Sequence, residues 1–253
     1  MEKPVTLILG VGQTVGEAIA LRCLEAGHAV IAVDPDEEQL AQISKAAGDK
    51  IETHHGDVHT KMGLKNALCL CSESQNRIDN VVVIPSLPEP DTLLNTETNH
   101  DADIDKSIKS ALNTLRIIGS DMAERDGDVD TAGDKKRQAG TFTFVLSAAS
   151  AGSQKGYFSE GVAQKAIRSI VQTASVELAQ HHIRVNAISA LRPRAERREP
   201  WLAKRTPIGR ASTGEEIAET VLFLTNSASN IITGETIVLD GGRQNLSGIV
   251  DDD

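Results

Sequence analysis

The sequence of 253 residues has no long apolar run, few cysteines and no excess of positive charge. No stretch approaches the ~18 consecutive apolar residues that indicate a membrane helix. The first residues, MEKPVTLILGVG, are typical of a β-strand rather than of a charged and then apolar leader, so we expect no signal peptide. A chain of this length can bury a large core, and we expect a single domain over residues 1–253.

The few cysteines argue against a disulfide-stabilised fold. There are three, an odd number, and all fall in segments that we expect to be helical. This usage favours a reducing, cytoplasmic location. Cys69 and Cys71, two residues apart, would point to different sides of a helix, which argues against a metal pair. His54, His55 and His59 are close in sequence, but we expect ordinary hydrogen-bonded histidines there and no metal site.

The net charge of −10 argues against a nucleic-acid surface. One segment has the opposite sign, because residues 191–210, LRPRAERREPWLAKRTPIGR, contain seven arginines and lysines. A solvated loop and helix face would account for this segment. Alternatively, its guanidinium groups could cradle an anionic partner, such as an acidic subunit surface or phosphates.

Glycines follow the first predicted strand, Val5–Leu9, in the sequence GVGQTVGEAIALRCLEAG. Gly10, Gly12 and Gly16 predict a tight turn into a helix whose N-terminus could hold a pyrophosphate. Asp34 ends the next predicted strand, where a carboxylate can bind both ribose hydroxyls of NAD and repel the 2′-phosphate of NADP. The same residue could instead cap the helix that follows it. The pattern favours a dinucleotide site.

Residues Phe144 to Ser189 predict a strand–helix–strand unit of a parallel sheet, with FTFVLS and IRVNAIS as its strands. Apolar residues recur along the helix at Ala163, Ala166, Ile167, Ile170, Val171, Ala174 and Leu178. The stretches QKAIRSI and VELAQHHIRVNAIS resemble the core of the short-chain dehydrogenase/reductase family. The resemblance implies an α/β fold with a doubly wound, parallel, seven-stranded sheet (the Rossmann fold) in three α/β/α layers.

The resembled enzymes use a serine after the first strand of this unit, and a tyrosine and a lysine four residues apart on its helix. The lysine is present as Lys165, but Gly161 stands in the tyrosine's place and Ala148 in the serine's place. Hydride transfer to or from a carbonyl needs a proton donor at the oxygen, and neither residue has one. Loss of one oxyanion donor costs about 10²–10³ in rate, and loss of the acid a further factor of about 10²–10⁴. We therefore assign no catalytic residue.

A neighbouring hydroxyl group could replace the missing ones. Tyr157 lies four residues before the vacant tyrosine position, and Ser147 and Ser150 flank the vacant serine position. To replace the missing groups, each of these hydroxyl groups would have to be displaced by about 5 Å or more along the chain. An active NAD-dependent dehydrogenase that uses Tyr157 or Ser150 with Lys165 is therefore the alternative interpretation.

Further departures line the expected cofactor and substrate cleft. The family has a glycine at Thr14, an Asn-Asn-Ala-Gly turn at Val83–Ser86 and a Pro-Gly pair at Ala190–Leu191. A proline within the altered turn also removes an amide donor. The family's asparagine on the following helix falls at Ser107, with Asn113 as the competing candidate.

Other positions of the resembled dinucleotide site are kept. Asp57 and Val58 match the pair that contacts adenine in the family, and Lys165 matches the lysine that bonds the nicotinamide ribose. The candidate cofactor-binding residues are Gly10, Gly12, Gly16, Asp34, Asp57 and Lys165. NAD is the expected cofactor of this site, whereas Thr14 and the altered turn at Val83–Ser86 argue against its binding.

From Pro207 the sequence TPIGRASTGEEIAETVLFLTNSASNIITGETIVLDGG resembles the family closely. Ser212 or Thr213 is expected to cap a helix there. In the family this block builds the flat interface of two-fold tetramers. We expect a surface loop at residues 126–140 and a C-terminal tail at residues 243–253.

An emptied site beside an intact oligomer-forming block favours a non-catalytic structural or regulatory subunit, paired in a hetero-oligomer, expected to be a tetramer, with an active paralogue that binds NAD. Such two-gene dehydrogenases are known in the family. One oxidises 2-(hydroxy(phenyl)methyl)succinyl-CoA with NAD in anaerobic toluene breakdown, and this chain resembles a candidate for its silent subunit. A third hypothesis is a module that senses NAD(H) through Gly10, Gly16, Asp34 and Asp57 without reacting. We expect neither a membrane nor a nucleic-acid partner.

Overall fold

The computed structural model describes residues 3–11, 14–75, 77–86, 88–94, 100–127, 140–153, 155–191 and 206–246. Within these ranges seven strands form one parallel sheet in the order β3-β2-β1-β4-β5-β6-β7. The strands are β1 (Val5–Leu9), β2 (Ala29–Asp34), β3 (Ile51–His55), β4 (Asn80–Val83), β5 (Gly140–Ser147), β6 (Ile183–Ala190) and β7 (Thr236–Leu239).

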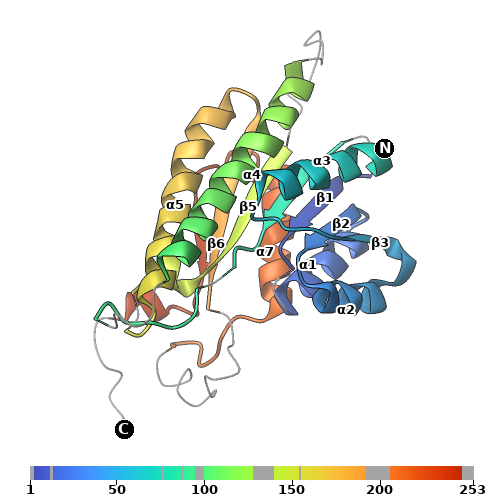
Figure 1. Ribbon diagram of the computed structural model, residues 1–253. Helices are drawn as coiled ribbons and strands as arrows, with labels where there is room; N and C mark the ends of the chain where they lie inside the picture. Colours follow the sequence, from blue (N-terminus) through green and yellow to red (C-terminus); the bar gives the residue numbers. More distant parts are fainter. Residues whose placement is uncertain are drawn as a thin grey trace.

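Helices cover both faces of the sheet in three layers (Figure 1). The helices are α1 (Thr14–Glu25), α2 (Glu37–Ala47), α3 (Lys61–Gln75), α4 (Asp101–Gly127), α5 (Phe158–Ala179) and α7 (Gly214–Thr225), with short 3₁₀ turns η1 (Gly48–Lys50), η2 (Ala148–Ser150), η3 (Ser227–Ser229) and η4 (Arg243–Asn245). Helices α3, α4 and α5 lie on one face, and α1, α2 and α7 on the other. The predicted fold class is confirmed.

Two hydrophobic clusters fill the space between the layers. Successive side chains of a strand point to opposite faces of a sheet. Leu7 and Phe144 therefore pack toward α4 and α5, whereas their neighbours Ile8 and Val145 pack toward α1 and α7. Because both faces are covered, β1 (VTLIL) and β4 (NVVV) are mostly continuous apolar runs, whereas the first half of β5 (GTFTFVLS) alternates threonine and phenylalanine.

Helix α7 begins at the predicted place. Thr213 is its N-cap and forms a capping box with Glu216, whereas the Ser212 hydroxyl donates instead to the Leu239 carbonyl at 2.5 Å. Helix α2 is capped by Asp36, whose carboxylate accepts from the first-turn amides. The alternative interpretation of Asp34 as that cap is therefore wrong.

Three sequence boundaries need correction. Helix α4 continues through Gly127 and β5 begins at Gly140, so both ends of the expected 126–140 loop belong to regular structure. Residues 128–139 lie outside the described ranges. In the expected tail, Arg243–Asn245 forms η4, and residues 247–253 lie outside the description. We also expected His54 and His55 in the loop with His59, but both are part of β3.

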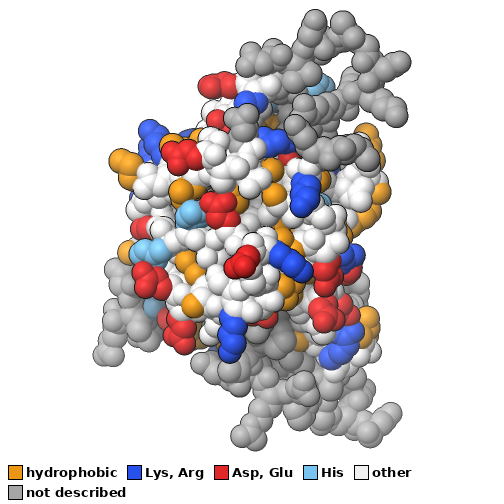
Figure 2. Space-filling model, turned by 90° about the vertical axis from the view of Figure 1, so that its right-hand side faces the viewer, with side chains coloured by type: hydrophobic (Ala, Val, Ile, Leu, Met, Phe, Trp, Pro, Cys, Tyr) orange, Lys and Arg blue, Asp and Glu red, His pale blue; other side chains and the backbone are white. Residues whose placement is uncertain are grey.

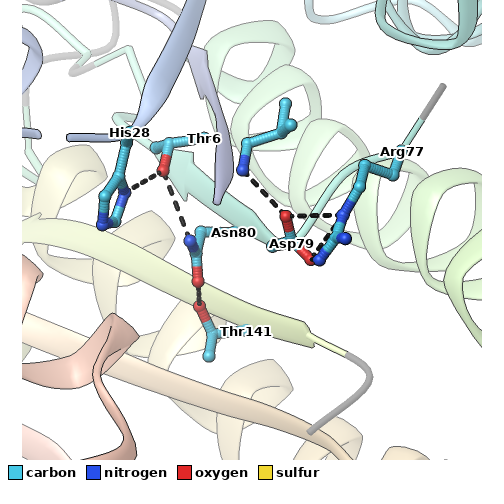
Figure 3. A network of polar contacts seen from close by, with 7 residues as sticks. Thr6, His28, Arg77, Asp79, Asn80 and Thr141 are labelled. Carbon is cyan, nitrogen blue, oxygen red and sulfur yellow. Dashed lines mark hydrogen bonds and ion pairs between the residues drawn. The ribbon is translucent and has the colours of Figure 1, made fainter. Parts of the chain in front are cut away.

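A buried polar network crosses the amino-terminal edge of the sheet (Figure 3). The Asn80 amide group donates to the Thr6 hydroxyl at 3.3 Å and accepts from the Thr141 hydroxyl at 2.9 Å. The Thr6 hydroxyl also pairs with His28 Nδ1 at 2.8 Å. These residues are neighbours because Thr6, Asn80 and Thr141 share one register row across β1, β4 and β5.

Asp79 links the amino ends of neighbouring strands at the same edge of the sheet. Its carboxylate accepts from the Val5 amide at 2.8 Å and from Arg77 Nε at 3.0 Å (Figure 3). Its backbone carbonyl accepts from the Thr141 amide at 2.9 Å. The amino ends of β1, β4 and β5 are therefore joined by hydrogen bonds of both the main chain and the side chains.

The surface beside the β3 edge carries interspersed acidic and basic side chains, with histidines among them (Figure 2). Across the described residues no helix is both long and apolar enough to cross a membrane. On α3, Cys69 is exposed and Cys71 is buried, as expected for two residues on different sides of the helix. Cys23, on α1, is also buried.

Candidate functional site

The carboxyl ends of all the described strands lie on one edge, because the strands are parallel. The strand order reverses between β1 and β4, the position at which an open α/β sheet forms a ligand crevice. Gly10 follows β1, Asp34 ends β2 and Asp57 follows β3, while Ala148 follows β5 on the same edge. The sheet thus brings most of the predicted site residues to one place.

The glycines after β1 are required by the turn itself. Gly10 has φ +78°, and a Cβ there would lie 2.4 Å from the Ile84 carbonyl oxygen. A Cβ on Gly16 would lie 1.9 Å from the Val11 carbonyl oxygen. Gly12 lies outside the described residues. These glycines are compatible with a nucleotide, but the close backbone approaches explain two of them without one.

The Asp34 carboxylate is buried, with 6% exposure, and already holds the turn. Its Oδ2 accepts from the Val11 amide at 2.5 Å and its Oδ1 from the Asp36 amide at 2.7 Å. Each carboxylate oxygen can accept a second hydrogen bond, so capacity for ribose hydroxyls is retained. Asp57 is exposed, and its Oδ1 accepts from the amide of His59 at 3.0 Å.

Helix α5 brings Gly161 and Lys165 together. A Cβ built on Gly161 would lie 3.7 Å from Lys165 Nζ, and no other described atom outside its chain neighbours and the backbone of its own helix turns comes within 4 Å of it. The position facing the ammonium therefore has room for a side chain and lacks one. Lys165 Nζ donates to the Gly152 carbonyl at 2.8 Å and to Ser153 Oγ at 3.2 Å, so the ammonium binds the loop that follows η2.

Ser147 forms hydrogen bonds that join β5 to α5. Its amide donates to Gln164 Oε1 at 3.0 Å, its hydroxyl to Glu160 Oε1 at 2.6 Å, and its carbonyl accepts from Ser189 Oγ at 3.2 Å. Glu160 is only 3% exposed. Sequence reasoning missed this buried carboxylate, although a charged residue three positions before Ala163, on the apolar face of α5, was the available signal.

Polar atoms near the vacant serine position lack partners. Ala148 opens the short turn η2, and the Ser150 hydroxyl in the same turn is buried without a hydrogen-bond partner among the described atoms. Gln164 Nε2 is also buried without a hydrogen-bond partner among the described atoms. Each such group costs about 1–3 kcal/mol. Tyr157 occupies the N-cap position of α5 without a capping hydrogen bond from its side chain.

Asp91, in the segment after β4, caps α5 from a distance. Its Oδ1 accepts from the Ser159 amide at 2.9 Å, its Oδ2 from the Ser159 hydroxyl at 2.5 Å, and its carbonyl from the Phe158 amide at 3.3 Å. Burial raises the pKa of Asp91, but the hydrogen bonds from Ser159 outweigh it and leave the pKa lowered. Sequence reasoning missed this cap because 68 residues separate the partners.

The turn after β4 is joined to α4 and to the loop after β3. The Ser107 hydroxyl, 3% exposed, donates to the Ser86 carbonyl at 3.3 Å, so Ser107 rather than Asn113 reaches this turn. The Ser86 hydroxyl lies 2.9 Å from His59 Nε2. His59 Nδ1 is buried and has no partner among the described atoms. The sequence pointed to His59, Ser86 and Ser107, but it gave no sign of the contact between His59 and Ser86.

The environment of His59 keeps its imidazole neutral near pH 7. Burial lowers the pKa of this ring, and the nearby ammonium of Lys106 lowers it further. The carboxylates of Asp57 and Asp34 act in the opposite direction but are weaker. The charges of both acids of the candidate dinucleotide site therefore act on the His59 ring.

The histidines of β3 make separate contacts. His54 Nε2 lies 2.5 Å from Glu52 Oε1, and His55 Nε2 lies 3.1 Å from the Pro35 carbonyl oxygen. Within the described ranges, no three or more His, Cys, Asp or Glu side chains are placed to hold a metal ion.

A family model described as enoyl-(acyl carrier protein) reductase matches residues 10–244. The chain belongs to the short-chain dehydrogenase/reductase family. Among its relatives, it is 28% identical to the short-chain reductase protein NovJ of Streptomyces niveus, over 96% of this chain and 94% of the relative. It is 27% identical to the 3-oxoacyl-(acyl-carrier-protein) reductase of Thermotoga maritima, over 96% and 98% of the two chains.

Solved structures share the fold over nearly the whole chain. A short-chain dehydrogenase/reductase family oxidoreductase from Burkholderia thailandensis has a TM-score of 0.82 and 25% identity, covering 98% of this chain and 95% of its own. A 3-ketoacyl-(acyl-carrier-protein) reductase from Brucella melitensis in complex with NADH has a TM-score of 0.81 and 20% identity, covering 96% and 98%. The latter likeness supports the fold alone.

The described residues fit the two halves of a dinucleotide unequally. On the adenosine side, Asp34 keeps free lone pairs and Asp57 is exposed. On the nicotinamide side, Gly161 and Ala148 supply neither an acid nor a hydroxyl, and Lys165 binds a loop. These two positions therefore carry no proton donor, and we derive no reaction step from them.

Proposed function

We propose that this chain is the non-catalytic structural or regulatory subunit of a hetero-oligomeric NAD-dependent short-chain dehydrogenase. The observation that carries the proposal is the vacancy at Gly161, where the missing side chain would face the Lys165 ammonium at 3.7 Å. In the resembled enzymes that side chain is the proton donor, and hydride transfer without a donor is slow. Ala148 removes the second hydroxyl of the same site.

The groups around the vacancy support the proposal because they are bound elsewhere. Lys165 holds Gly152 and Ser153, and the Ser147 hydroxyl holds the buried Glu160. Asp91 anchors the segment after β4 on the first turn of α5. A site prepared for a carbonyl substrate would keep hydroxyl donors directed at the reacting oxygen. These contacts instead stabilise the chain around α5.

An active paralogue would supply the serine, the tyrosine and the bound NAD, in a tetramer built with the C-terminal block of this chain. We place the partner's substrate among hydroxyacyl-CoA thioesters, with 2-(hydroxy(phenyl)methyl)succinyl-CoA oxidation in anaerobic toluene degradation as the candidate reaction. The acyl-carrier-protein thioesters in the name of one relative support this class. The buried free cysteines, Cys23 and Cys71, agree with a cytoplasmic location.

Two measurements test the proposal. The native complex is isolated and its subunits are identified by mass spectrometry; we expect a homologue with an intact serine, tyrosine and lysine. The single chain is then assayed with 3-hydroxybutyryl-CoA and NAD, and with acetoacetyl-CoA and NADH. No turnover is expected from the wild-type chain. Turnover that disappears in Tyr157→Phe would establish the alternative, an active dehydrogenase with an atypical site, and end the proposal.

Restoring the two missing hydroxyl groups tests directly whether their absence limits turnover. The double variant Ala148→Ser/Gly161→Tyr returns both hydroxyl groups, and a Cβ at position 161 meets only the flexible tip of Lys165 among the side chains around it. The matched control, Ala148→Ser/Gly161→Phe, has the same bulk without the phenol. If the vacancy limits the chemistry, the first variant exceeds the control by about 10²-fold or more. Equal rates would show that the missing phenol does not limit turnover.

A further inference from the structure

His59 and Ser86 join two loops that the sheet holds apart. His59 follows β3 and Ser86 follows β4, and β2 and β1 lie between these strands. At about 4.8 Å per strand, β3 and β4 are roughly 14 Å apart. The two side chains nevertheless meet at 2.9 Å. The loops after β3 and β4 therefore converge along the carboxyl edge of the sheet.

The meeting point lies beside the candidate adenosine side of the crevice. Asp57 is two residues before His59, and the carboxylates of both Asp57 and Asp34 raise the pKa of the ring. On the other side, Ser107 of α4 donates to the Ser86 carbonyl, and Ser110 of α4 donates to the Val58 carbonyl at 3.2 Å. Both loops are thus fixed to α4 with their side chains directed at one another.

The contact leaves one polar atom unsatisfied. His59 uses Nε2 for Ser86, and its Nδ1 is buried with no partner among the described atoms. In either neutral tautomer one ring nitrogen then lacks a hydrogen bond. Turning the ring toward water would satisfy that atom. Beside the hydrogen bonds to α4, the direct contact between the two loops is therefore one side-chain hydrogen bond, and it leaves a buried ring nitrogen without a partner among the described atoms.

We propose that the His59–Ser86 pair closes the adenosine side of the crevice, and that an adenine nucleotide enters only when this pair opens. The proposal does not depend on whether the chain is catalytic, because it concerns binding alone. It assigns Ser86, which stands where the resembled enzymes have a glycine, as the residue that prevents free access.

Calorimetric titration with 5′-AMP, which probes the adenosine side alone, and with NAD tests the proposal. Ser86→Gly removes the hydroxyl and the Cβ, and His59→Ala removes the ring. We expect at least a tenfold lower Kd for 5′-AMP in both variants than in the wild type. Ser110→Ala, which loses a hydrogen bond to the same loop without touching the pair, is the control and should bind as the wild type does. Thermal melting confirms that each variant is folded.

Each outcome of the titration either supports or overturns the proposal. Equal 5′-AMP affinity in the wild type and both variants, or no binding by any of them at millimolar ligand, would show that the pair does not control access. Weaker binding by the variants would show that the pair contacts the ligand, which also overturns the proposal. These results are separate from turnover, so the subunit proposal and the closure can fail independently. Hydrogen exchange at residues 56–60 should be faster in Ser86→Gly than in the wild type.

Discussion

The two edges of the sheet differ in how their polar groups are satisfied. At the amino edge, Thr6, Asn80 and Thr141 form a continuous buried row of hydrogen bonds. At the carboxyl edge, Ser150 Oγ and Gln164 Nε2 are buried without partners among the described atoms. The same strands β1, β4 and β5 supply both edges.

The difference separates the stability of the fold from the chemistry of the site. The strand registers and the polar row of the amino edge do not involve Ala148 or Gly161. Ala148, in η2 after β5, and Gly161, in the first turn of α5, differ from the resembled enzymes while the sheet keeps its order. The sheet therefore forms without a hydroxyl side chain at either position. The expected effects of substitutions at the two edges follow, from the largest to the smallest.

Gly10→Ala should destabilise the chain by about 3 kcal/mol, because a Cβ at φ +78° is strained and would approach the Ile84 carbonyl at 2.4 Å. Urea unfolding measures the change. The control is Gly27→Ala, which has φ +87° but no described atom within 4 Å of the added Cβ. It should cost about 1 kcal/mol. Equal losses in the two variants would contradict the close approach at Gly10.

Asn80→Ala should cost about 2 kcal/mol, because the buried Thr141 hydroxyl loses its acceptor. Adding Thr141→Val removes the unsatisfied hydroxyl. The double variant should therefore be less destabilised than the sum of the two single variants in urea unfolding. Strict additivity would show that the amino-edge row contributes no coupling.

Asp91→Ala should cost about 1 kcal/mol at pH 7, because the first-turn amides of α5 lose their remote cap. The lowered pKa of Asp91 sets the pH dependence. Its contribution to stability is present above the unfolded-state pKa of about 3.9 and is lost as the pH falls through the lower folded-state value. The difference in Tm between the wild type and Asp91→Asn should therefore shrink toward pH 3. A difference that is constant with pH would exclude a role for the charge.

Gly161→Ala should stabilise the chain by about 0.5–1 kcal/mol, because glycine is unfavourable within a helix and the added Cβ meets only the flexible tip of Lys165. Thermal unfolding measures the gain. A loss of stability would mean that the vacancy is not open, and would count against the restored-site variant as well.

The framework was predictable because its signals are local. The apolar runs of β1 and β5 and the Thr213 capping box are properties of a few consecutive residues. The sequence distance of four residues also sufficed to place Gly161 beside Lys165, because both are on one helix.

The contacts that occupy the site were not predictable, because their partners are far apart in sequence. Asp91 meets Ser159 and His59 meets Ser86 only after the sheet has formed. Asp34 was predicted at the correct strand end, but its use as a clamp on the Val11 amide requires the turn geometry. Sequence patterns identify such groups by type, whereas the fold decides what they bind.

The open space at Gly161 also offers a labelling position. Gly161→Cys would introduce a thiol beside Lys165 with no described backbone atom in its way. Cys23 and Cys71 would not compete for a maleimide, because both are buried and burial raises the pKa of each thiol to about 12. Cys69 is the exposed background thiol among the described residues, and Cys69→Ser would remove it. A fluorophore or spin label at position 161 would then report directly on what approaches this face of α5 in solution.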